Sequence, residues 1–202
     1  MSSIAILGLA LLASTAQAHV TANPPKLPAD SYGSTAFRIG HGCSGSPTVG
    51  LTIQIPEGVT SAKGRQLAGW TVSTTSRAVD ATTNVTTAVT WTAQQDSTNA
   101  TAPLGLVEGV YQDFDLYFKT PALSDATKTI YFPTTQICAN MSQPWTDIPV
   151  AGQPEPAHPA PALNLTAKDT AGASGASAAP QTVASTLALI APLVLTTSVF
   201  AL

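Results

Sequence analysis

The stretch Asp113-Phe114-Asp115-Leu116-Tyr117-Phe118-Lys119 places an apolar side chain at every second position. Successive side chains of a β-strand point to opposite faces of a sheet, so this alternation predicts a strand with one buried face. Leu51, Ile53 and Ile55 repeat the pattern, and their run ends at the turn sequence Pro56-Glu57-Gly58. The period of two indicates a β domain.

Short apolar segments of the same kind recur from Ser34 to Ile148, separated by Gly, Pro, Asn and Asp, with no convincing helical period. This regular punctuation favours an all-β, immunoglobulin-like β-sandwich, with a small barrel as the alternative. Trp70 and Trp91 fall within alternating segments and are predicted core residues. Besides the two strands above, we predict strands at Ser34–Ile39, Gly69–Thr74, Thr86–Ala93 and Lys128–Phe132, with Val20–Ala22 or Trp145–Ile148 as edges.

Residues 1–18 are interpreted as a signal peptide. The apolar run Ile4–Leu12 is too short to span a bilayer, and Ala16-Gln17-Ala18 is a small-residue cleavage site, although the usual basic residue before the run is missing. Cleavage would make His19 the first residue of the mature protein.

A second apolar run extends from about Val183 to Leu202 and carries no charge. Small residues, a polar spacer and a terminal apolar tail are typical of a glycosylphosphatidylinositol (GPI) anchor signal, whose tail is removed. A single transmembrane helix is the alternative, but no Lys or Arg follows the run as a cytoplasmic stop. We expect lipid attachment within Gly172–Ser177, removal of a tail over 177–202, and a secreted protein held at the cell surface, on the plasma membrane or in the wall.

Removing both ends leaves about 155 residues, enough for one domain. We expect that domain over 19–150, followed by a Pro/Ala/Ser-rich stalk over 151–176. His158 lies in this predicted stalk and is expected to be solvated.

The composition fits an extracellular glycoprotein. Only 9% of the residues are charged, and the net charge of −3 does not indicate nucleic-acid binding. Glycans would help such a chain stay soluble, and the acceptor sequence Asn-X-Ser/Thr occurs at Asn84, Asn99, Asn140 and Asn164.

Cys43 and Cys138 are the only cysteines. In an oxidising compartment such a pair most simply forms one disulfide, here closing a loop of about 95 residues. The alternative, two thiolate ligands, would favour Cu(I).

A histidine at a free N-terminus offers two nitrogens, the α-amino group and imidazole Nδ1, which close a chelate ring on a metal ion. Cu(II) takes nitrogen ligands in a tetragonal plane and suits this arrangement. The alternative is that His19 is merely the residue that follows the cut.

The sequence resembles the YcnI-like secreted copper-binding domain across essentially the whole domain, in order. The matching segments are His19-Val20-Thr21-Ala22-Asn23-Pro24-Pro25, Phe37-Arg38-Ile39-Gly40-His41-Gly42-Cys43, Ile53-Gln54-Ile55-Pro56-Glu57-Gly58-Val59, Gly69-Trp70, Val89-Thr90-Trp91, Tyr111-Gln112-Asp113-Phe114, Tyr131–Cys138 and Trp145-Thr146-Asp147-Ile148-Pro149.

The resemblance implies a β-sandwich that binds one Cu(II) through a single-histidine brace, with an acidic residue and a tryptophan nearby. His19 matches the brace. Trp145 best matches the tryptophan and would pack over the metal, because an indole N–H is a donor only. An aromatic side chain that closes the sandwich edge is the alternative.

The acidic residue departs from the family pattern, because Thr48–Ile55 contains no Asp or Glu. Asp113 is the best metal-ligand candidate by its motif position, although for any one acid taken alone a solvated charge on a strand face is the favoured interpretation. The weaker options are Glu57, Asp115 and Asp147.

We therefore expect a cell-surface Cu(II)-binding protein, not an enzyme, that captures, buffers or delivers copper, with a copper transporter or chaperone as its candidate partner. The α-amino ligand must lose a proton to bind, so acid should release the metal.

One rival function is a copper-dependent oxidative enzyme resembling lytic polysaccharide monooxygenases, in which His41 would be the second histidine; otherwise His41 is a solvated turn residue. Another rival is a structural cell-wall protein. No Ser-His-Asp set is assignable, which argues against hydrolase chemistry.

Overall fold

The computed structural model describes residues 19–95, 98–99, 104–125 and 127–168, and the regular structure of this part of the chain is all β. These residues belong to a compact unit that ends at Asp169. The strands are β1 (Thr21–Asn23), β2 (Lys26–Pro28), β3 (Tyr32–Ile39), β4 (Thr48–Gln54), β5 (Thr60–Gly64), β6 (Trp70–Ala78), β7 (Asn84–Ala93), β8 (Gln112–Lys119), β9 (Thr129–Tyr131), β10 (Thr134–Cys138), β11 (Ser142–Trp145) and β12 (Ala162–Thr166).

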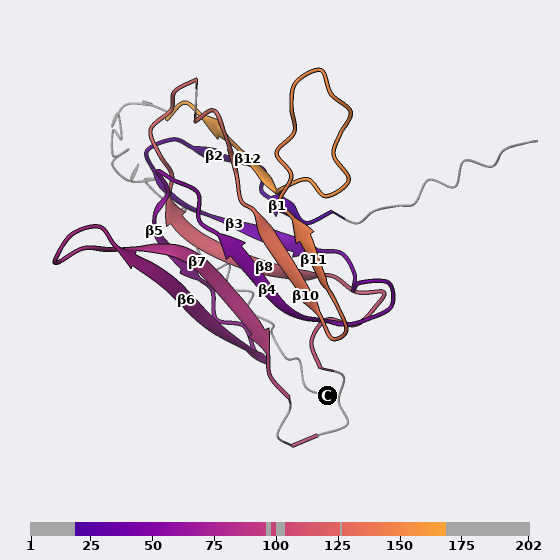
Figure 1. Cartoon of the computed structure of the whole chain (residues 1–202). Coiled ribbons are helices and arrows are strands. Elements are labelled where there is room, and N and C mark those ends of the chain that lie inside the picture. Colours follow the sequence, from indigo (N-terminus) through magenta and orange to yellow (C-terminus); the bar gives the residue numbers. More distant parts are fainter. Residues whose placement is uncertain (1–18, 96–97, 100–103, 126, 169–202) are drawn as a thin grey trace, which may run out of the picture. The chain divides into compact units, whose positions relative to one another are not determined.

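The strands form three sheets with the orders β1-β3-β8-β5, β11-β10-β4-β7-β6 and β2-β12-β9 (Figure 1). All pairings are antiparallel within the described residues except that of β12 with β2, which is parallel. The first two sheets pack face to face, as the predicted sandwich requires.

The core lies between these two sheets. Phe114, Leu116 and Phe118 are fully buried, so the alternation of β8 separates a core face from a solvent face as predicted. The ring of Phe114 meets Trp91 of β7 edge to face, with centroids 5.6 Å apart. Trp70 packs on the same phenylalanine at 5.0 Å, which confirms both tryptophans as core residues.

Gly64 at the end of β5 allows the two sheets to approach closely. A Cβ atom there would lie 2.7 Å from the Trp91 ring and 2.8 Å from side-chain atoms of Val72 and Val89. Next to it, the carbonyl oxygen of Arg65 accepts a 2.9 Å hydrogen bond from Trp91 Nε1. The largest core side chain is thereby buried with its polar atom satisfied.

The predicted strands are present, with ends shifted by a few residues, and the candidate edge Val20–Ala22 forms as β1. The other candidate edge is misplaced, because β11 spans Ser142–Trp145 and shares only Trp145 with the predicted Trp145–Ile148. The predicted turn at Pro56-Glu57-Gly58 also forms, with Gly58 at φ 84° and a 3.2 Å hydrogen bond from Val59 N to Pro56 O. Four strands were not predicted: β2, β5, β10 and β12.

The predicted boundary at residue 150 is wrong. Residues 162–166 form β12, which lies beside β2 (Figure 1), and Leu163 and Leu165 belong to the hydrophobic core. The reason is that Ala162-Leu163-Asn164-Leu165-Thr166 alternates like the other strands, a signal hidden by the preceding prolines.

The predicted signal peptide, lipid attachment range and removed tail lie outside the described residues. Within the described residues, no helix is long and apolar enough to cross a membrane.

Candidate metal centre

His19 lies directly before β1 and is half-buried. Its neighbour Val20 is buried in the core, and β1 pairs with β3 from Thr21 onward. These contacts fix the backbone that carries His19. The imidazole meets the indole of Trp145 edge to face, with ring centroids 5.7 Å apart and an interplanar angle of 61°.

Trp145 ends β11, the edge strand of its sheet, and is only 5% exposed. It therefore closes the sandwich edge and also contacts His19, while its packing over a metal stays a prediction. A second imidazole, that of His158, packs on the same indole with centroids 5.6 Å apart. The expectation that His158 is solvated holds only in part, because the chain around it folds back onto Trp145 and leaves the side chain half-buried.

Asp147 holds this returning segment in place. Its backbone N–H donates to the carbonyl oxygen of His158 at 3.0 Å, and its own carbonyl oxygen accepts from Ala160 N at 2.8 Å. One of its carboxylate oxygens accepts from His158 N at 3.3 Å. The carboxylate of Asp147 thus stabilises the segment that carries His158.

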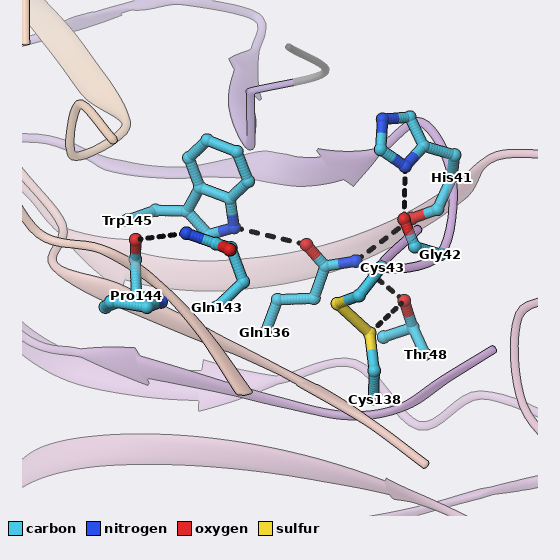
Figure 2. Close-up of a disulfide and its surroundings, with 9 residues drawn as sticks. All are labelled: His41, Gly42, Cys43, Thr48, Gln136, Cys138, Gln143, Pro144 and Trp145. Carbon is cyan, nitrogen blue, oxygen red and sulfur yellow. Dashed lines mark hydrogen bonds between the residues drawn. A yellow bond between two sulfur atoms is a disulfide. The ribbon is translucent and has the colours of Figure 1, made fainter. Parts of the chain in front are cut away.

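A buried hydrogen-bond chain fixes the indole from behind (Figure 2). Trp145 Nε1 donates to Gln136 Oε1 at 3.1 Å, and Gln136 Nε2 donates to Thr48 Oγ1 at 2.7 Å and to the carbonyl oxygen of His41 at 3.0 Å. Thr48 Oγ1 lies 3.8 Å from the sulfur of Cys138. Gln136 is only 3% exposed, and its bonds to Trp145 and Thr48 are buried, so water competes little for them.

The predicted disulfide between Cys43 and Cys138 is present, and it joins the loop after β3 to the end of β10. It brings His41 near the late strands, as its position in the sequence suggested. The His41 ring, however, donates from Nδ1 to the carbonyl oxygen of Gly42.

Beside His19 lies an open groove of about 320 Å³. The aromatic ring of Tyr131 and the carboxylate-bearing residue Glu155 line it together with His19. Its other lining residues are Val20, Thr21, Ala22, Pro25, Pro149, Pro159, Ala160, Pro161 and Ala162.

Asp113, the predicted acidic ligand, is not among the residues that line this groove. It pairs with Arg38 on the solvent face of the neighbouring sheet, where Arg38 Nε and Nη2 each donate to one carboxylate oxygen at 2.7 Å. The hydrogen bond that Asp113 accepts from Arg38 raises the pKa of the Arg38 guanidinium above its ordinary value. Both oxygens of Asp113 are therefore occupied.

The three weaker acidic candidates also lie outside the groove. Asp115 pairs with Arg65 at 3.1 Å, Glu57 lines a separate hollow by the turn after β4, and Asp147 holds the loop described above. Glu155 was not predicted as a ligand because it stands between two prolines in the predicted stalk. The alternation at 162–166 is the signal that could have placed it in the domain.

The residues at the groove fit a copper ion by their chemistry. Among the described residues, no three His, Cys, Asp or Glu side chains form a metal-binding group. A mature N-terminal histidine would need fewer partners, because one residue would supply two nitrogens, and Glu155, which lines the same groove, carries a carboxylate. Amine, imidazole and carboxylate are donors that Cu(II) accepts.

The asparagines of the four sequons are exposed: Asn84 at the start of β7, Asn99 in the following connection, Asn140 after β10 and Asn164 on β12.

The fold and the disulfide define an immunoglobulin-like β-sandwich whose candidate site lies at one sheet edge. A crystal structure of an uncharacterized protein from Nocardia farcinica, described as having an immunoglobulin-like fold, is similar, with 29% identity and a TM-score of 0.58. The match covers 74% of this chain and 99% of that one. The comparison with curated proteins found no match. Residues 19–165 match the model of DUF1775, a domain of unknown function, and the chain belongs to this family.

Proposed function

We propose that this chain is a secreted, cell-surface Cu(II)-binding protein of the YcnI-like type. It holds one copper ion at a mature N-terminal His19 and captures, buffers or delivers the ion without catalytic turnover. The observation that carries the proposal is the placement of His19, which lies against a buried tryptophan and beside a groove that contains a carboxylate.

In this proposal the α-amino nitrogen and Nδ1 of His19 bind the metal, and Glu155 supplies the oxygen ligand. Glu155 is preferred to Asp113 because it lines the groove with His19, whereas both oxygens of Asp113 bind Arg38. Trp145 limits access from one side. Copper when bound would supply a Lewis-acidic, redox-active centre, and the protein side chains would orient His19 and shield it.

The decisive experiment is Cu(II) electron paramagnetic resonance with a parallel titration, on the processed protein beginning at His19. The matched control carries one extra residue before His19, which converts the α-amine to an amide. We expect a one-to-one type-2 signal with nitrogen coupling that the extension abolishes. Equal binding by both forms, or by neither, would contradict the brace and favour a structural wall protein.

A pair of carboxylate variants tests the acidic ligand. Glu155→Gln should weaken copper affinity at least about tenfold, in line with losses seen around metal sites. Asp113→Asn removes an equivalent charge but breaks only a surface ion pair, so it should leave affinity unchanged. The opposite ranking would return Asp113 to the ligand set.

The rival oxidative enzyme needs a second histidine ligand. The ring contact of His41 is with Gly42, and His41 does not line the groove. His41→Ala should therefore leave the copper signal intact, and a loss of nitrogen coupling in this variant would favour the enzyme.

Localisation is tested separately from metal binding. Mass spectrometry of the mature protein should give His19 as its first residue, and phosphatidylinositol-specific phospholipase should release the protein from cell membranes. Cleavage at another residue would remove the brace from consideration.

A further inference from the structure

The solvent face of the β1-β3-β8-β5 sheet carries unusually exposed aromatic side chains. Tyr32 is 58% exposed, Tyr117 is 48% exposed, and Tyr111, just before β8, is 62% exposed. Rings of this size are normally buried, and exposed groups of them mark interaction sites. We call the outward side chains of β3 and β8, together with Tyr111, the tyrosine face.

The tyrosines stand at both ends of this face. Tyr32 and Tyr117 lie at one end with near-parallel rings, whose centroids are 5.8 Å apart. At the other end Tyr111 lies under the Arg38 guanidinium, 4.5 Å from its ring centroid. Tyr32 and Arg38 lie on the same strand six positions apart, so the face is about 20 Å long at the usual rise of a strand.

Hydrogen-bonding groups fill the space between the two ends. A hollow of about 320 Å³ adjoins Tyr117 and is lined by Ser34, Lys63, Gly64, Arg65 and Asp115. Across the rest of the face the Arg38–Asp113 pair offers further polar atoms. The face therefore presents ring surfaces at its ends and polar groups along its length.

The charges on and around this face are largely paired. Arg38 pairs with Asp113, Arg65 with Asp115, and Lys119 with Asp30 at 2.8 Å. Paired charges leave a weak net field, which does not suit a polyanion. The cores of protein–protein interfaces are depleted of charged residues, so a face crossed by ion pairs also differs from those.

The face is also free of the protein's own predicted glycans. The four sequons lie on β7, on β12 and in connections, and none lies on β1, β3, β5 or β8. None of the face's residues lines the groove at His19.

We propose that the tyrosine face binds a linear, uncharged polysaccharide. Sugar rings present a C–H face that packs on an aromatic ring, and hydroxyl edges that pair with guanidinium and carboxylate groups. An extended chain of such rings matches a face with aromatics at its ends and polar groups between them. This site is independent of copper and adds a second binding activity.

The test is a depletion assay of the secreted protein, obtained from the full chain, on insoluble cellulose, 1,3-β-glucan and chitin. We expect binding to at least one of these polymers, with little dependence on salt. The double variant Tyr32→Ala/Tyr117→Ala should lower the association constant at least tenfold. Val79→Ala, which truncates an exposed apolar side chain in the turn between β6 and β7 of the other sheet, should bind as the native protein does.

A second variant keeps the test valid if the double variant fails to fold. Tyr111→Ala lies outside the strands and should weaken binding without disturbing the sheet. If the native protein binds none of the three polymers, the proposal is overturned. Native-like binding by folded tyrosine variants would also overturn it.

Discussion

Gln136 is the residue on which the geometry around Trp145 depends most. It is a buried amide whose oxygen accepts from the indole and whose nitrogen donates to Thr48 and to His41. A buried amide with all its partners in place orients its neighbours, whereas the loss of one partner leaves uncompensated polar groups. The orientation of Trp145 against His19 therefore depends on a side chain in the adjacent strand.

Gln136→Leu keeps the approximate volume but leaves the Trp145 N–H without its acceptor. We expect the free energy of unfolding to fall by about 1–3 kcal/mol, the usual cost of an unsatisfied buried polar group. Urea unfolding measures this change. Gln143→Leu, on the neighbouring strand, removes an exposed side-chain hydrogen bond of 3.5 Å to the carbonyl oxygen of Pro144 and should change stability by less than about 0.5 kcal/mol. Equal effects of the two variants would contradict the role assigned to Gln136.

The sequence made His19 and Trp145 recognisable, since both stand in segments that match a family motif, and the structure brings their rings together. Gln136 and Glu155 could not be assigned in the same way. Whether a glutamine is buried depends on strand pairing, and whether a glutamate reaches a groove depends on how a loop returns. Neither is encoded in local spacing.

At the scale of elements, β12 carries the largest difference from expectation. Leu163 is fully buried and Leu165 is 5% exposed, although both follow a proline-rich segment. Proline-rich composition describes the connection well, but it says nothing about whether the chain afterwards rejoins the sheet.

A chain that ends at Val150 tests the contribution of β12. It loses two buried leucines, which are worth about 1.5–3 kcal/mol each, so stability should fall by about 3–6 kcal/mol. Thermal denaturation followed by circular dichroism measures the loss. A chain that ends at Lys168 is the control and should melt like the full protein; equal melting of the Val150 chain would place residues 151–168 outside the folded domain after all.

The hairpin of β6 and β7 offers a prediction about pH. Asp80 in its turn accepts hydrogen bonds from Thr82 N and Thr83 N at 2.8 Å each, and these bonds lower its pKa below the ordinary 3.8. A lowered carboxyl pKa stabilises the folded form above the unfolded pKa, and this stabilisation is lost as the pH falls through the folded value.

Hydrogen exchange at the hairpin amides should therefore be faster in Asp80→Asn than in the native protein near neutral pH. The difference should shrink in acid well below 3.8, where the native carboxyl is protonated as well. A difference that persists unchanged in acid would show that the charge of Asp80 plays no part.

At the scale of the whole molecule, the Cys43–Cys138 disulfide joins a loop of one sheet to a strand of the other across 95 residues of sequence. In the chain-entropy model a closed loop of this length contributes about 4–5 kcal/mol, by restricting the unfolded chain.

The double variant Cys43→Ser/Cys138→Ser should lose up to about 4–5 kcal/mol of unfolding free energy. Guanidinium unfolding measures the change, with a wild-type sample treated with a thiol reductant as a comparison. A loss below about 1 kcal/mol would mean that the unfolded chain is already compact without the bridge.

The sandwich class and the pairing of the cysteines followed from patterns that act throughout the chain: alternation along strands and an even cysteine count. The third sheet did not, because β2 is only three residues long, follows two prolines and ends on a third, and its partner β12 is far away in sequence. Such short strands are stabilised by their tertiary partners, and their own sequence gives little signal.

The parallel pairing of β2 with β12 also sets the order in which the molecule can be completed. A ribosome delivers His19 early, but the groove beside it needs Glu155 and Pro159–Ala162, and the neighbouring β2 finds its partner only when residues 164–166 have been synthesised. Until then His19 lacks the groove beside it, and β2 lacks its partner strand. The groove beside His19 is therefore among the last parts of the domain to form, and a nascent chain lacks it until almost the whole domain has been synthesised.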